Sequence, residues 1–156
     1  MGKSVKFGIF TKPHHIKKLR AYLIGSTISN FFISTDYQGP YTKKFDIGVS
    51  YCFPRIIDLD KSHMPWFNYH PAPLPEYRGA HVYEEGIRDR VSRWGVTLHR
   101  MIQEVDSGTI IRERRFDLSS FPIAIDELGS IAHYHLYQLF KETIESLPKY
   151  VGHIKQ

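Results

Sequence analysis

The sequence predicts an α/β fold: an open, mostly parallel sheet with helices on both faces and an antiparallel hairpin at one edge. Three observations predict it. Short apolar runs alternate with helix-like segments in the first half of the chain. In the second half, a short polar loop separates two strand-like runs, which is typical of an antiparallel pair. A long amphipathic segment follows them and is expected to cover one face of the sheet.

The first half of the chain predicts four strands and one helix. Val5–Phe10 is short and apolar, as expected of a buried strand. Thr11 as N-cap and Pro13 in the first turn favour a helix that Gly25 ends. Further strands are expected at residues 30–35, 45–51 and around Asn68, with a Gly39-Pro40 turn in the loop between the first two of these.

The second half changes its pattern. A helix is expected at residues 80–90, after a loop that contains three prolines. Strands are expected at 95–101 and 109–118, joined by the polar loop 103–108. Apolar residues then recur at helical spacing from 125 to 147.

Length and composition indicate one globular domain over residues 1–156, since 156 residues suffice to bury a core. The formal net charge of +5 favours an anionic small molecule, because no nucleic-acid recognition motif accompanies the charge. The single cysteine rules out an intramolecular disulfide and a Cys-rich zinc site. No signal-peptide pattern and no long apolar span is evident, so we expect a cytoplasmic protein without a membrane partner.

The stretch Trp66–Gly79, W-F-N-Y-H-P-A-P-L-P-E-Y-R-G, carries the most informative polar residues. Side chains alternate along a strand, so Asn68 and His70 share one face. The prolines that follow end the strand, and ligands bind at this edge of open α/β sheets. Asp106 lies in the later loop V-D-S-G. Taken singly, each residue has an ordinary structural interpretation. Asn68 could hydrogen-bond the backbone, His70 could be a hydrogen-bonded structural residue, and Asp106 could stabilise a turn.

No metal site is expected from the other histidines. His133 and His135 stand at i and i+2 of a helix and do not share a face. The pair His14-His15 is interpreted as a helix start. His81 and His99 lie near the polar stretch in sequence and are interpreted as structural.

From residue 67 to residue 118 the chain resembles the folate-dependent formyltransferases. The resemblance rests on N-Y-H-P-A-P-L-P-E-Y-R-G, G-V-T-L-H-R-M and E-V-D-S-G-T-I-I, in that order. It implies a Rossmann-like fold and transfer of a formyl group from 10-formyltetrahydrofolate to an amine. It also implies that Asn68, His70 and Asp106 are the catalytic residues. Asn68 and a protonated His70 would stabilise the developing oxyanion, and Asp106 would favour that protonated state.

The same resemblance implies how the two substrates are held. The pterin ring of the donor would lie between two loops, residues 53–57 on one side and residues 103–105 on the other. The donor residues are Phe53, Pro54, Arg55, Ile56, Ile57, Gln103, Glu104 and Val105, and the acceptor residues are Pro73, Leu74 and Arg78.

Three departures from the family pattern bear on the acceptor. The loop after the first strand lacks a Gly-rich phosphate cradle, residues 36–44 are too few for a further helix and strand, and no carboxy-terminal barrel domain follows. These departures, together with the motifs Y-R-G and G-V-T-L-H-R-M, favour a nucleotide-linked amino sugar as the acceptor. A homodimer is also compatible with the sequence. The alternatives are a 10-formyltetrahydrofolate hydrolase, a glycinamide ribotide formyltransferase and a non-catalytic folate-binding module.

Overall fold

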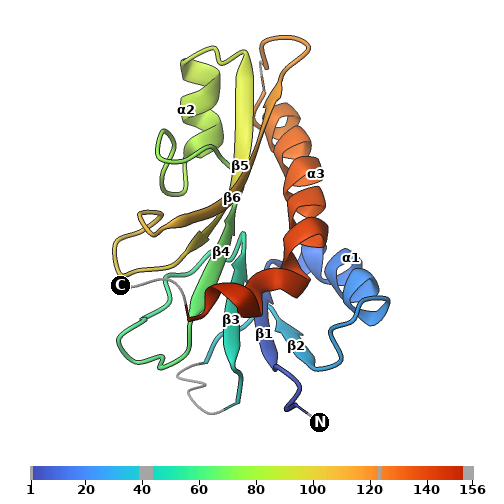
Figure 1. Cartoon of the computed structure of the whole chain (residues 1–156). Helices are drawn as coiled ribbons and strands as arrows, with labels where there is room; N and C mark the ends of the chain where they lie inside the picture. Colours follow the sequence, from blue (N-terminus) through green and yellow to red (C-terminus); the bar gives the residue numbers. More distant parts are fainter. Residues whose placement is uncertain (1, 39–43, 123, 153–156) are drawn as a thin grey trace.

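A six-stranded sheet with strand order β2-β1-β3-β4-β5-β6 forms the centre of the computed structural model (Figure 1). The structure describes residues 2–38, 44–122 and 124–152. The first four strands in this order run parallel, β5 is antiparallel to β4, and β6 is antiparallel to β5. The elements are β1 (Phe7–Thr11), α1 (Pro13–Ile24), β2 (Phe31–Ser34), β3 (Ile47–Tyr51), β4 (Trp66–His70), α2 (Val82–Arg88), β5 (Arg93–Arg100), β6 (Ile110–Asp117), α3 (Ile125–Thr143) and the 3₁₀ helix η1 (Ile144–Tyr150). The predicted α/β class, with an antiparallel hairpin at its edge, is confirmed.

Two differences from the expected element boundaries concern the helices. Lys12 rather than Thr11 is the N-cap of α1, because Thr11 still belongs to β1 and its hydroxyl donates to the Tyr51 carbonyl at 2.7 Å. The final α-helix ends at Thr143 and continues as η1, which contains Pro148. The expected Gly39-Pro40 turn lies outside the described residues.

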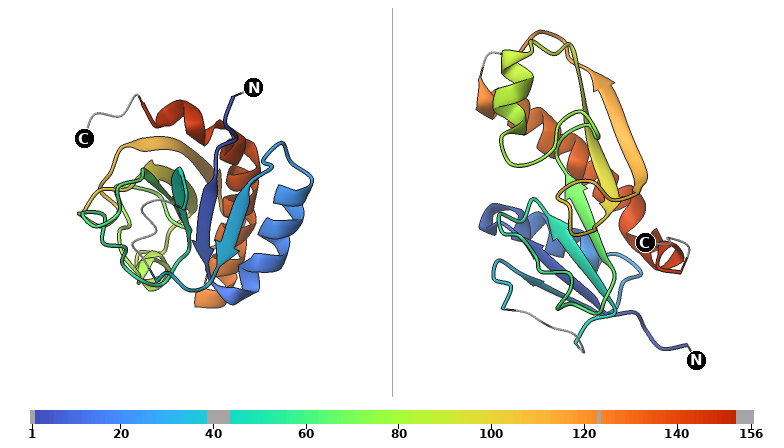
Figure 2. Two further views of the ribbon diagram at one scale, coloured as in Figure 1. Left: turned by 90° about the horizontal axis from the view of Figure 1, so that it is seen from below. Right: turned by 90° about the vertical axis from the view of Figure 1, so that its left-hand side faces the viewer.

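Helices α1 and α3 lie side by side against one face of the sheet, as both views in Figure 2 show. Their apolar stripes supply Leu19 and Leu23 from α1 and Leu136 and Phe140 from α3, and all four side chains are fully buried. The Tyr22 hydroxyl of α1 donates to the Lys141 carbonyl of α3 at 2.8 Å and fastens the two helices together. No described helix has the length and apolar character needed to cross a membrane.

The opposite face of the sheet is covered by an aromatic-rich cluster from strands and loops. Phe10, Ile57, Met64 and Trp66 are its buried members. Among the described residues, no helical side chain contributes to this cluster. The connection from β2 to β3 spans only residues 35–46.

The buried hydroxyl pair of Tyr69 and Thr143 joins β4 to α3 across the core. The two oxygens lie 2.8 Å apart, and Thr143 also bonds the Leu139 carbonyl at 2.6 Å. Thr143→Val keeps the shape but leaves the Tyr69 hydroxyl without this partner, so we expect a loss of about 1–3 kcal/mol of unfolding free energy. Urea denaturation measures it. The double variant Tyr69→Phe/Thr143→Val is expected to recover most of the loss, and a double variant as unstable as the sum of the single variants would contradict this account.

Candidate active site

The carboxyl end of β4 carries the two polar residues around which the site forms. Phe67 and Tyr69 point into the core that the helices cover, so the alternation of the strand turns Asn68 and His70 to the other face. His70 is the last residue of β4 and is only 4% exposed. This placement agrees with the strand predicted from the sequence.

Asp106 reaches the same place from the loop between β5 and β6. It adopts a positive φ of 54°, and the chain then passes close to β5 at Gly108. A Cβ at Gly108 would collide with the Arg100 carbonyl oxygen, so this approach requires glycine. Gly79, whose φ is 85°, donates its backbone N–H to Asp106 Oδ2 at 2.8 Å. The carboxylate is therefore held from two separate loops.

Asn68, His70 and Asp106 meet as the sequence predicted. Asn68 Nδ2 donates to Asp106 Oδ1 at 3.2 Å, and His70 Nδ1 lies 3.6 Å from Asp106 Oδ2. The second distance is that of an ion pair rather than of a hydrogen bond. One carboxylate thus faces both other members of the cluster.

The proton position on His70 follows from its second ring nitrogen. His70 Nε2 lies 2.7 Å from the Tyr77 carbonyl, which can only accept, so Nε2 carries a proton and Nδ1 faces Asp106. Burial lowers the pKa of His70 below its ordinary value, although Asp106 and the Tyr77 carbonyl oppose that shift and His99 adds to it. Burial therefore favours the neutral form of the imidazole, whereas the mechanism that the resemblance implies uses a protonated ring.

Asp106 remains ionised despite its partial burial. Burial alone would raise the pKa of its carboxyl group, but the contacts with His99 and His70 and the hydrogen bond from the Gly79 N–H together bring the pKa below its ordinary value. A stable carboxylate beside a neutral imidazole can stabilise that ring when it takes up a proton.

His99 is a member of the cluster that the sequence interpretation placed among the structural residues. It lies opposite Asn68 in the β4–β5 register and is 1% exposed. Its Nδ1 donates to the Arg100 carbonyl at 3.0 Å, so Nε2 accepts from Asn68 Nδ2 at 3.2 Å and lies 3.4 Å from Asp106 Oδ1. Side chains alternate along a strand, so the sequence shows that His99 shares a face with Thr97. The residues that His99 meets on β4 follow only from the register between the two strands.

A cavity of about 370 Å³ opens beside this cluster, a size within the range of small-molecule sites. Its lining includes Asn68, His70, His99 and Asp106. Seven of the eight expected donor residues also line it: Phe53, Pro54, Arg55, Ile56, Ile57, Gln103 and Val105. Further lining residues that the sequence did not indicate are Lys12, Ser50, Tyr83, Met101, Ile102 and His133.

The remaining predicted residues lie outside this lining. Glu104 and Arg78 point toward each other, with 3.6 Å between carboxylate and guanidinium. Pro73 and Leu74 are buried, and the Leu74 carbonyl accepts from Arg115 at 3.1 Å. Other residues of the proline loop, Pro71 and Gly79, line the cavity, whereas the three predicted acceptor residues do not.

The fold and the site together define a class: an α/β domain with a polar cluster at the carboxyl edge of its sheet, next to a cavity. The comparisons with known proteins refine this class. Residues 53–120 match the family described as Formyl transferase. The methionyl-tRNA formyltransferase of Borrelia turicatae is 29% identical over 151 residues, which is 94% of this chain and 48% of that protein. The chain thus spans about half the length of this curated relative.

Solved structures of formyltransferases share the fold. The N-formyltransferase of Helicobacter canadensis, solved with folinic acid and dTDP-3-aminofucose, aligns with a TM-score of 0.80 at 19% identity, over 94% of this chain and 65% of that one. The phosphoribosylglycinamide formyltransferase of Streptococcus pneumoniae aligns with a TM-score of 0.69 at 22% identity, over 92% of this chain and 98% of that one. Residues 53–120 therefore match the Formyl transferase family in sequence, and the chain shares the fold of solved formyltransferases, in agreement with the resemblance noted in its motifs.

Proposed function

We propose that this chain transfers the formyl group of 10-formyltetrahydrofolate to a primary amine, with Asn68, His70 and Asp106 as catalytic residues. The observation that carries the proposal is the convergence of these three side chains on one cavity that residues 53–57 also line. An amide donor, a neutral imidazole and a carboxylate are the groups that acyl transfer to an amine requires.

The cavity walls fit a flat heteroaromatic ring. Ile56 is 83% exposed, Val105 48% and Ile102 38%, and all three line the cavity. Exposed apolar side chains gathered at a cavity indicate a ligand surface rather than a core. When bound, 10-formyltetrahydrofolate supplies an activated formyl carbon whose bond to N10 can be broken.

His70 is the residue suited to move the proton. Attack by the amine forms the new C–N bond and leaves the attacking nitrogen with an extra proton, and cleavage of the old C–N bond requires a proton on N10. The Nδ1 lone pair of His70 accepts the first proton, because the Tyr77 carbonyl keeps the other proton at Nε2. The Asp106 carboxylate stabilises the resulting imidazolium until the proton passes to N10.

Asn68 supplies the neutral hydrogen-bond donor for the oxygen that becomes negative. Its Nδ2 group is oriented by Asp106 Oδ1 and His99 Nε2 in this structure. Both amide hydrogens are engaged in these contacts, so we expect the hydrogen bond to His99 to be transferred to the oxygen as charge develops. His99 thus positions the amide.

The protonation state of His70 can be tested directly by NMR of its imidazole nitrogens, with the signal assigned from a His70→Gln variant. Since burial lowers its pKa, we expect the neutral ring with the proton on Nε2 at pH 7 and a titration midpoint below about 6.5. As the pH falls through that midpoint, the base is lost. A ring that carries both protons at pH 7 would contradict this mechanism.

Ile56→Ala tests whether the exposed apolar side chains at the cavity bind the formyl donor. We expect the KM for 10-formyltetrahydrofolate to rise roughly tenfold, because apolar contact area with the ring is lost. Thermal stability should not change, since Ile56 is 83% exposed. Ile24→Ala, at a side chain that is 71% exposed on α1 and outside the cavity lining, is the matched control. If both variants changed the KM equally, Ile56 would not be part of the donor site.

For the acceptor we propose the amino group of a nucleotide-linked amino sugar. The motifs Y-R-G and G-V-T-L-H-R-M support it, as does the net charge of +5, which suits a diphosphate. The similar Helicobacter canadensis enzyme was solved with such a sugar nucleotide. The relatives also include enzymes for methionyl-tRNA and for phosphoribosylglycinamide, so both are the competing acceptors in the test.

One assay separates these functions. The full chain is mixed with 10-formyltetrahydrofolate and, in separate reactions, with a panel of nucleotide-linked amino sugars, glycinamide ribotide, methionyl-tRNA or no amine. Tetrahydrofolate release in proportion to a formylated sugar supports the proposal in full. Formylation of another amine supports formyl transfer but shows that the proposed acceptor is wrong. Release of formate without an amine identifies a hydrolase. Tight binding of the donor without any turnover identifies a folate-binding module and overturns the catalytic proposal.

A further inference from the structure

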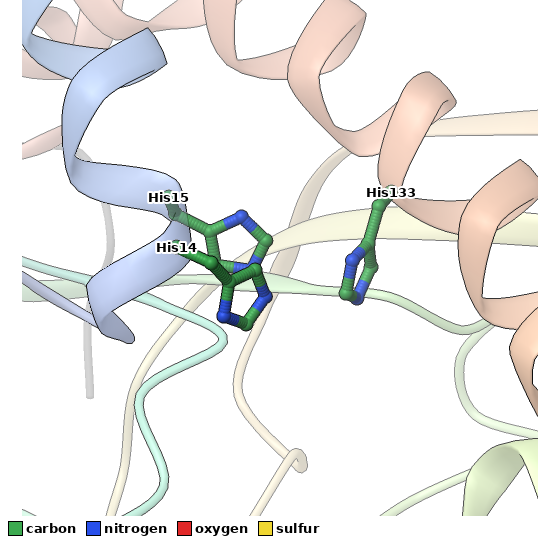
Figure 3. Close-up of side chains that lie close together, drawn as sticks. All are labelled: His14, His15 and His133. Atoms are coloured by element: carbon green, nitrogen blue, oxygen red, sulfur yellow. The ribbon is translucent and has the colours of Figure 1, made fainter.

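Three histidines that are far apart in the sequence meet between α1 and α3. His14 and His15 open α1, and His133 faces them from α3 (Figure 3). One ring nitrogen of each residue lies within 4.8 Å of the corresponding nitrogen of the other two. A tetrahedral ion with Zn–N distances near 2.0–2.1 Å holds its ligand atoms roughly 3.4 Å apart. Small side-chain rotations would therefore bring the three nitrogens to a common ion.

His15 provides an independent sign that a ligand belongs here. It is 1% exposed, and neither of its ring nitrogens has a hydrogen-bond partner among the described residues. Buried polar atoms in folded proteins are nearly always paired with protein or solvent groups. Its ring packs against Tyr51 and His133, with centroid distances of 5.2 and 4.9 Å, so a metal ion between the histidines would satisfy a nitrogen that the protein leaves unpaired.

The donor set selects the kind of ion. Three imidazole nitrogens suit Zn²⁺ and other divalent first-row transition metals, whereas Mg²⁺ and Ca²⁺ require oxygen ligands. Three protein ligands also leave a fourth position for water or an anion. His133 and Lys12 line the cavity beside Asn68, so that position lies at the cavity edge.

The charges around the cluster are consistent with neutral ligands and an anionic fourth group. Lys12 and Lys18 lie close enough to the histidines to interact with them electrostatically. The two lysines oppose a bare cation, and an anionic fourth ligand would offset that repulsion.

We propose that His14, His15 and His133 form a binding site for one divalent transition-metal ion, best suited to Zn²⁺, that links α1 to α3 and leaves one coordination position open. The site is separate from the Asn68–His70–Asp106 cluster, and its existence does not depend on formyl transfer. The sequence-based expectation of no metal site considered His133 only with its helical neighbour His135.

The experiment uses the full chain without a histidine tag, stripped of metal with a chelator and dialysed. Co²⁺ is titrated as the probe, and Zn²⁺ is then added as competitor. We expect the visible absorption bands of tetrahedral Co²⁺ to saturate at one ion per chain and to disappear when Zn²⁺ displaces it. After dialysis against Zn²⁺, elemental analysis should give one zinc per chain.

Two ligand variants at positions that are not fully buried keep the test independent of folding. His14→Asn and His133→Asn should each weaken Co²⁺ affinity roughly a hundredfold or more, and the double variant should lose the bands. His63→Asn, at an exposed histidine outside the cluster, is the matched control and should bind as the parent does. Circular dichroism confirms that each variant is folded. The absence of saturable Co²⁺ bands in the parent, or unchanged affinity in the double variant, overturns the proposal.

Discussion

Asp106→Asn is expected to lower kcat for formyl transfer by about a hundred- to ten-thousandfold while the protein stays folded. The substitution keeps the shape and still offers one oxygen to the Gly79 N–H, which lies 2.8 Å from Oδ2. It removes the negative charge 3.6 Å from His70 Nδ1. The imidazolium that forms when the amine loses its proton is then buried without a counter-ion, and that state becomes costly.

The measurement is steady-state release of tetrahydrofolate, with circular dichroism as the check on folding. Asp60→Asn is the matched control, because that carboxylate is exposed and lies outside the cavity lining. The KM for the donor should change much less than kcat, since Asp106 acts on the proton rather than on the pterin. If Asp106→Asn retains more than a tenth of the parental kcat, the role assigned to the carboxylate is wrong.

Gly108→Ala is expected to disrupt the site through the backbone alone. An added Cβ would collide with the Arg100 carbonyl oxygen, a backbone atom that cannot turn aside. The β5–β6 loop must then move away from β5, and Asp106, two residues earlier, moves with it. We expect kcat to fall at least about a hundredfold, since a displacement of about 1 Å can cost that much, together with a loss of roughly 1–3 kcal/mol in unfolding free energy.

Gly25→Ala is the matched control for this backbone effect. A Cβ there would meet its nearest atom at 3.7 Å, which is ordinary contact, and the φ of −86° suits alanine. Both variants are compared by chemical denaturation and by tetrahydrofolate release. Should Gly108→Ala retain parental activity and stability, the close approach of the loop to β5 would not be what positions Asp106.

Local sequence patterns predicted the elements of this fold well. Strand alternation placed Asn68 and His70 on one face, and the helical spacing of apolar residues from 125 to 147 predicted the long helix α3. The Phe53–Ile57 loop was assigned to the donor by family resemblance, and it does line the cavity. These features depend on neighbours within a few residues, where periodicity and motif carry information.

Contacts between distant segments were the part that the sequence left open. The aromatic cluster around Trp66, which strands and loops form on the second face of the sheet, was not expected from the sequence. The acceptor residues Pro73 and Leu74 were expected at the substrate, but they are buried and do not line the cavity. Each of these outcomes depends on which segments pack together, and no local pattern states that.

By itself, then, the sequence determined the strand that bears Asn68 and His70, the carboxylate that faces them and the chemical family to which these motifs point. Tertiary structure decided that His99 stands opposite Asn68, that burial favours the neutral form of His70 and that His133 meets His14 and His15. The physical reason is the distance along the chain over which each feature is determined. Alternation and helical period are properties of adjacent residues, whereas register, burial and the meeting of side chains from two helices arise only when the whole chain has packed.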